Sequence, residues 1–136
     1  SSDLNLQDIA NTAWVLAIVQ MEAPTLFAAV AKQVQRRVGE FNPQGLANTA
    51  WAFATAQADV PEIFAVVAEG ALQRLGQFNA QGLANTAWAL ATAQVLVPTL
   101  FSAIAVQAPR HSGEFSAQGL ANTAWAFAQL SNITGT

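Results

Sequence analysis

The 136-residue chain has no cysteine, one histidine and few charged side chains, which make up 10% of the residues. The absence of cysteine excludes disulfides, thiolate metal sites and cysteine nucleophiles, and a single histidine excludes a multi-histidine metal cluster. No window offers the roughly 18 to 20 consecutive apolar residues of a membrane-spanning helix. Hydrophobic residues nevertheless form 53% of the chain, which excludes a disordered polar tail and predicts a folded domain.

The sequence also lacks the residue combinations on which enzymes depend. It has no glycine-rich phosphate loop and no metalloprotease motif, and the acidic side chains fall mainly at expected turns. A carboxylate that recurs with a repeat is more often a solvated turn residue than a catalyst. We therefore expect a protein without enzymatic activity, metal or cofactor.

A repeat of 37 residues organises the chain. The four tryptophans mark it, at Trp14, Trp51, Trp88 and Trp125. Each ends nearly the same string, Leu-Ala-Asn-Thr-Ala-Trp, with isoleucine replacing leucine in the first copy. A second recurring element follows each of the first three strings, and its copies begin at Pro24, Pro61 and Pro98. Each unit therefore contains two segments and two turns.

Both segments of a unit have the apolar periodicity of α-helices. The first helix has N-cap residue types before it, at Asn42, Asn79 and Ser116, each preceded by a phenylalanine that can form a hydrophobic staple. The second helix begins at the proline and is expected to stop at a glycine in the left-handed conformation, at Gly39, Gly76 and Gly113. Pro109 lies late in the third second helix and should break or kink it.

Two short helices cannot bury their own apolar faces, so neighbouring units must stack in register. The sequence predicts an all-α fold, an α-solenoid of 37-residue helix-turn-helix repeats in a single array over residues 1–136. The units are expected at about residues 4–40, 41–77 and 78–114, with a partial unit at 115–136. Because neither end carries a polar capping repeat, we expect a section of a longer array, or a short array whose ends a partner covers.

Side-chain amides form one column along the layer of first helices. The column contains Asn11, Asn48, Asn85 and Asn122, with Gln44, Gln81 and Gln118 one turn earlier. Such amides can hydrogen-bond base edges, so they could contact single-stranded RNA at roughly one nucleotide per repeat. An asparagine that is the same in every repeat can equally form a structural ladder between helices. Both interpretations remain open at this point.

Basic side chains form a second column, near the expected ends of the second helices. Its members are Arg36, Arg37, Arg74, Arg110 and His111. They could pair with phosphates, which would give salt-dependent affinity without sequence selectivity. The alternative is that they complement the helix dipole and pair with Glu40 and Glu114 nearby. The net charge of −3 is not that of a strongly basic nucleic-acid binder. The tryptophan column is expected in the core rather than as a platform for stacked bases.

The string Leu-Ala-Asn-Thr-Ala-Trp-Ala-Phe-Ala occurs at residues 46–54 and 120–128. It resembles the signature helix of octotricopeptide and heptatricopeptide repeat proteins of algae, apicomplexans and related protists, and the 37-residue period is more similar to the heptatricopeptide unit. The resemblance implies an organellar protein, of a chloroplast or mitochondrion, that binds RNA in its processing, stabilisation or translation, or that holds ribosomal RNA. It assigns the RNA contacts to the asparagine column and the neighbouring glutamines.

RNA binding is therefore the leading functional hypothesis, with single-stranded or ribosomal RNA as the partner. The alternative is a protein-interaction or scaffold subunit of a large organellar assembly, such as a ribosome or a photosynthetic complex. Low charge, small-residue surfaces and open apolar ends would suit docking onto protein.

Overall fold

The structure, a computed structural model, describes residues 24–57 and 60–134, and all regular elements within these ranges are helical. The α-helices are α2 (Pro24–Arg37), α3 (Pro43–Thr55), α4 (Pro61–Gln73), α5 (Ala80–Thr92), α6 (Pro98–Gln107) and α7 (Ala117–Thr134). Short 3-10 helices follow the even-numbered ones, η1 (Val38–Glu40), η2 (Leu75–Gln77) and η3 (Ala108–Glu114). The all-α prediction is confirmed. The predictions that fall on Asn11 and Trp14 lie outside the described residues.

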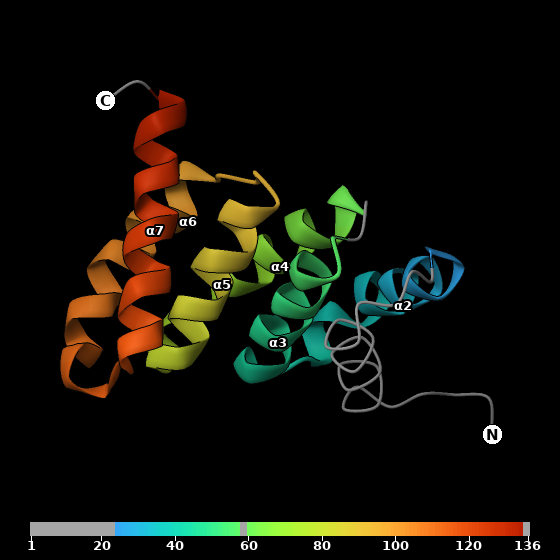
Figure 1. Cartoon of the computed structure of the whole chain (residues 1–136). Coiled ribbons are helices and arrows are strands. Elements are labelled where there is room, and N and C mark those ends of the chain that lie inside the picture. Colours follow the sequence, from blue (N-terminus) through green and yellow to red (C-terminus); the bar gives the residue numbers. More distant parts are fainter. Residues whose placement is uncertain (1–23, 58–59, 135–136) are drawn as a thin grey trace.

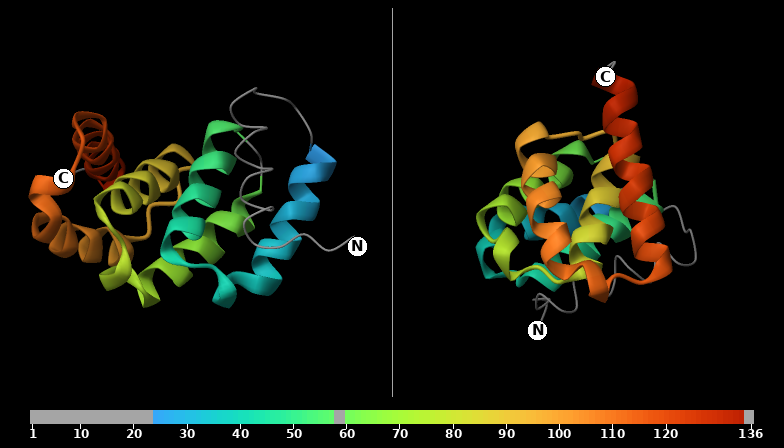
Figure 2. Two further views of the ribbon diagram at one scale, coloured as in Figure 1. Left: turned by 90° about the horizontal axis from the view of Figure 1, so that it is seen from below. Right: turned by 90° about the vertical axis from the view of Figure 1, so that its left-hand side faces the viewer.

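The helices form two rows. The first helices of successive units, α3, α5 and α7, pack against one another in order, and the second helices, α2, α4 and α6, do the same. Figure 1 shows α7 and α2 at opposite ends, and Figure 2 shows the two rows from below and from the α7 end. This stacking is consistent with the predicted solenoid. Within the described residues, no helix is long and apolar enough to cross a membrane.

The starts of the first helices follow the sequence prediction. A backbone N–H at the third helical position donates to the capping side chain, from Gly45 to Asn42 (2.7 Å), from Gly82 to Asn79 (2.7 Å) and from Gly119 to Ser116 (2.9 Å). The preceding Phe41 and Phe78 are buried, as expected for a hydrophobic staple. A Cβ at Gly82 would lie 3.1 Å from the Phe78 ring and 3.2 Å from the Asn79 side-chain oxygen. Glycine therefore leaves room for the cap and the staple together.

The prediction for the ends of the second helices is wrong. The helices α2 and α4 stop before their glycines, which lie inside the 3-10 turns, and neither Gly39 nor Gly76 has a left-handed φ. The turn continues in the right-handed sense, and the chain leaves it in extended conformation to reach the next N-cap, so no left-handed residue is required. The third copy ends earlier. Because Pro109 cannot continue the α-helical hydrogen bonds, α6 has 10 residues where α4 has 13, and this break was predicted.

Left-handed residues end the first helices instead. Gln57 has a φ of 56° and Gln94 a φ of 62°. After α5 the backbone N–H of Gln94 donates to the Ala91 carbonyl (3.1 Å) and that of Val95 to the Leu90 carbonyl (2.8 Å). This is the hydrogen-bond pattern of a Schellman motif, with glutamine in the place that glycine usually takes.

The core lies between the two rows. Leu46 and Phe53 of α3, Ile63 of α4 and Leu90 of α5 are completely buried. The tryptophans differ from the prediction, because Trp51 and Trp88 are only partly buried against the core, and Trp125 is 43% exposed. Their repeat position lies at the edge of the packed face, where the interior cannot enclose a whole indole.

Candidate nucleic-acid interface

Side-chain amides from two neighbouring first helices converge on one pocket, which we call the amide pocket. It has a volume of about 340 Å³ and lies between α5 and α7. Its amide lining consists of Gln81, Asn85, Gln118 and Asn122, and the other lining residues are Ala84, Glu114, Phe115, Ser116 and Gly119. The structure thus brings together four of the residues that the sequence singled out.

The asparagines of this column do not form a ladder between the described helices. The Asn122 side-chain oxygen accepts a hydrogen bond from the Gln118 amide (3.1 Å), within the same helix. The side-chain amides of Asn48 and Asn85 are partly buried, and neither has a hydrogen-bond partner in the described part of the chain. Their donors and acceptors are therefore available to a ligand, since an amide offers both.

A related pocket lies one repeat earlier, between the starts of α3 and α5. It measures about 230 Å³ and is lined by Asn42, Pro43, Gln44, Gln77, Phe78, Asn79 and Gly82. Gln44 and Gln77 hold the repeat positions of Gln81 and Glu114 in the amide pocket. The two pockets therefore repeat along the first-helix row, although Asn48 does not line the earlier one.

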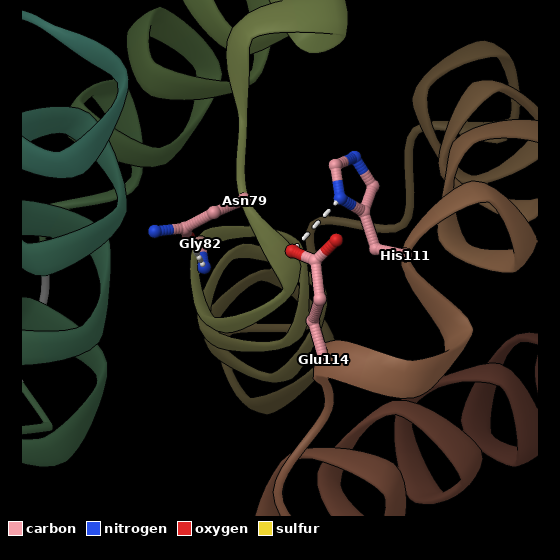
Figure 3. A network of polar contacts seen from close by, with 4 residues as sticks. All are labelled: Asn79, Gly82, His111 and Glu114. Carbon is pink, nitrogen blue, oxygen red and sulfur yellow. Dashed lines mark hydrogen bonds and ion pairs between the residues drawn. The ribbon is translucent and has the colours of Figure 1, made fainter.

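A histidine–carboxylate contact involves Glu114, one of the residues that line the amide pocket. The His111 Nδ1 is 3.3 Å from a Glu114 carboxylate oxygen, and Figure 3 shows this pair beside the capped start of α5 at Asn79. Arg37 and Glu40 form the corresponding contact two units earlier, at 3.4 Å. For both basic side chains, Arg37 and His111, the structure shows the acidic partner that one of the two sequence interpretations named.

Arg74 has a structural partner as well. Its guanidinium donates one hydrogen bond to the Phe41 carbonyl and another, 3.3 Å long, to the Val38 carbonyl. Both carbonyls belong to the turn that precedes α3, so this side chain joins two successive units. Arg74 is therefore a poor candidate for binding phosphate.

Three cations are left without a partner within the described residues. Lys32, Arg36 and Arg110 are exposed. Of the basic column, only Arg36 and Arg110 therefore remain as candidates for binding phosphate. Lys32 is a further candidate, which the sequence analysis did not include in the column.

The sequence did not identify the full lining of the amide pocket. Glu114 was interpreted as a turn residue and a partner for a nearby cation, and Ser116 only as an N-cap. Their place in the sequence just before Gln118 was the available signal. In the described residues, no three histidine or acidic side chains lie close enough together to hold a metal ion.

Comparison with known proteins gives a family. No curated protein matches the chain. The family model of the RNA-editing substrate-binding complex 6 protein matches residues 1–134. This is an RNA-related helical family, but it is not an octotricopeptide or heptatricopeptide family, so the resemblance was wrong in its finer part. The string that suggested it consists largely of residues that are buried in the packing of α3, such as Leu46, Thr49 and Ala50. The chain belongs to the RNA-editing substrate-binding complex 6 protein family.

Proposed function

We propose that this protein binds single-stranded RNA as a subunit of an RNA-editing complex, with the bases contacting the amide pockets of the first-helix row. The convergence of Gln81, Asn85, Gln118 and Asn122 on one pocket carries the proposal. Side-chain amides match the mixed donors and acceptors of base edges, and membership of the RNA-editing substrate-binding complex 6 family supports RNA as the ligand. The role is binding without catalysis.

The pocket geometry favours unpaired RNA. Bases in a duplex are stacked and paired, whereas an unpaired base can turn out and enter a pocket between two helices. One base would contact Asn85 from α5 and Asn122 from α7, and the next would enter the pocket beside Gln44. Because the amides are the same in successive repeats, we expect little discrimination between successive bases.

The free cations limit the electrostatic part of the affinity. Only Lys32, Arg36 and Arg110 are exposed and unpartnered in the described residues, and the whole chain carries a net charge of −3. We expect such a protein to bind RNA with moderate affinity by itself. Other subunits of the complex would supply further phosphate contacts. Location in a mitochondrion or chloroplast remains a prediction from the sequence.

The double substitution of Asn85→Ala and Asn122→Ala tests this function. It should weaken binding of a mixed single-stranded RNA by about tenfold or more, because each pair of base-edge hydrogen bonds contributes about 1–3 kcal/mol. The control is Asn132→Ala, an exposed asparagine of α7 that does not line the pocket. Equal affinity of the double variant and the control, with unchanged helical circular dichroism, would remove the amide pocket from the proposal.

A second function, contact with protein, is favoured by the apolar side chains that α7 exposes. Leu120 is 54% and Trp125 43% exposed. A family named after a complex is consistent with protein partners as well as RNA.

A further inference from the structure

The two pockets of the first-helix row differ in charge. Glu114 lines the amide pocket, whereas Gln77 holds the same repeat position in the earlier pocket. The N-cap residues Asn79 and Ser116 differ as well, but the side-chain oxygen of each already accepts a hydrogen bond from a backbone N–H. Among the side chains that line the two pockets, only that of Glu114 is charged. The amide pocket therefore contains a group that the earlier pocket lacks.

The carboxylate of Glu114 is accessible to a ligand. Its side chain is 61% exposed, and one of its oxygens lies 3.3 Å from the His111 Nδ1. Figure 3 shows the two side chains directed towards each other. The second oxygen has no hydrogen-bond partner in the part of the chain that the structure describes. Because each carboxylate oxygen can accept two hydrogen bonds, the contact with His111 restrains the side chain and still leaves both oxygens able to accept.

A carboxylate and an amide distinguish bases in different ways, because at neutral pH a carboxylate only accepts hydrogen bonds, whereas an amide also donates them. The pairing edge of guanine has two adjacent donors, the N1–H and the N2 amino group, which match the two oxygens of a carboxylate. Adenine and cytosine each have one amino group beside a ring nitrogen that accepts. Uracil has a single N–H between two carbonyl oxygens, so it would place a lone pair against the second carboxylate oxygen.

The glutamine of the earlier pocket has no such preference between guanine and uracil. Its amide can accept from the ring N–H and donate to the neighbouring carbonyl oxygen, and both bases carry these two groups side by side. Replacement of glutamine by glutamate at this repeat position therefore changes a site that fits both bases into one that fits guanine.

We propose that Glu114 makes the amide pocket selective for guanine in single-stranded RNA, whereas the earlier pocket, with Gln77, accepts guanine and uracil alike. This selectivity requires a base in the amide pocket and so rests on the proposed function. The carboxylate accepts from the N1–H and the N2 amino group of guanine, and the side chains of Asn85 and Asn122 offer donors and acceptors to the rest of the base. The repeated amides discriminate little, so the carboxylate sets the preference.

Two short RNAs of equal length test this selectivity. One is an oligouridine, and the other carries guanosines at isolated positions, which prevents quadruplex formation. In fluorescence anisotropy the parent chain should bind the guanosine RNA about fivefold more tightly, near the lower limit for a bidentate contact because the Glu114 side chain is 61% exposed. Inosine in place of guanosine should remove most of this preference, because inosine lacks the N2 amino group and keeps the N1–H.

The variant Glu114→Gln tests the residue itself. It gives the amide pocket the side chain that Gln77 supplies in the earlier pocket, so the two RNAs should bind with nearly equal affinity. Glu69→Gln is the matched control, because it removes the same charge from an exposed position of α4 that lines neither pocket. The control should keep the preference of the parent chain for guanosine.

The inference would be overturned by equal binding of the guanosine and uridine RNAs to the parent chain. A preference that survives in Glu114→Gln, that inosine retains, or that Glu69→Gln removes equally would overturn it too. If Asn85→Ala combined with Asn122→Ala still weakens binding in such a case, the proposed function stands and only the guanine selectivity fails. A folded chain that binds neither RNA would overturn both.

Discussion

The guanidinium of Arg74 donates a hydrogen bond to the backbone carbonyl of Phe41, the first residue of the same 37-residue unit. Phe41 is itself buried as the staple of α3, so Arg74, near the end of this unit, fixes the start of the same unit. The cation thereby satisfies a carbonyl in a turn that has left the helical hydrogen-bond pattern. This contact, together with the Val38 carbonyl, explains why a basic residue here serves stability.

Replacement of Arg74 by glutamine should therefore reduce stability. We expect a loss of about 1–3 kcal/mol in the free energy of unfolding, because hydrogen bonds from a charged group to the Phe41 and Val38 carbonyls disappear. Urea denaturation followed by circular dichroism measures this loss. Arg36→Gln is the control, since Arg36 is exposed and has no partner in the described residues. If both variants unfold at the same urea concentration as the parent, Arg74 does not join the repeats.

Thr86 and Thr123 hold the same repeat position, but their replacement by valine should affect stability differently. The Thr86 hydroxyl is fully buried without a hydrogen-bond partner, whereas the Thr123 hydroxyl donates to the Gly119 carbonyl at 2.8 Å. Thr86→Val should raise the free energy of unfolding by about 1 kcal/mol, because it removes an unsatisfied buried group. Thr123→Val is the matched change and should lower stability or leave it unchanged. Destabilisation by Thr86→Val would show that its hydroxyl has a partner in solution.

Glycine should be more stabilising than alanine at the positions of the two glutamines with a left-handed backbone. Gln94→Gly should stabilise the chain relative to Gln94→Ala by about 1–2 kcal/mol, because only glycine adopts the φ of 62° without a steric cost. Thermal denaturation of the two variants measures the difference. A more stable alanine variant would mean that the Schellman motif after α5 does not form.

The salt dependence of RNA binding should come from the unpartnered cations. Arg36→Gln combined with Arg110→Gln should flatten the slope of log K against log salt by about 1.4, at roughly 0.7 for each lost phosphate contact with a single strand. The comparison pair is Arg37→Gln combined with Arg74→Gln, whose cations already contact Glu40 and backbone carbonyls. If the substitution of Arg37 and Arg74 flattened the slope more than that of Arg36 and Arg110, the partnered cations of the basic column would be the ones that bind phosphate.

The repeated sequence predicted the helices well because each local signal has one structural meaning. Asn79 before a helical stretch caps it, and Pro109 interrupts one, whatever the rest of the fold does. The glycine prediction failed because a 3-10 turn and a left-handed cap both use glycine in similar places. Sequence also placed Asn85 and Asn122 in one column, but their meeting at one pocket depends on how closely α5 and α7 approach. The roles of Arg36 and Arg74 were not separable from sequence, because both are arginines near the end of a second helix.

Binding of single-stranded RNA by the purified chain tests the central claim most directly. Fluorescence anisotropy with a mixed-sequence RNA should be recorded between roughly 50 and 200 mM salt, the range in which phosphate contacts affect affinity. We predict saturable binding that weakens with salt with a slope of about −2, because three exposed cations at roughly 0.7 each supply the phosphate contacts. A folded chain that binds no RNA at the lowest salt concentration would contradict the account and leave contact with protein as the function.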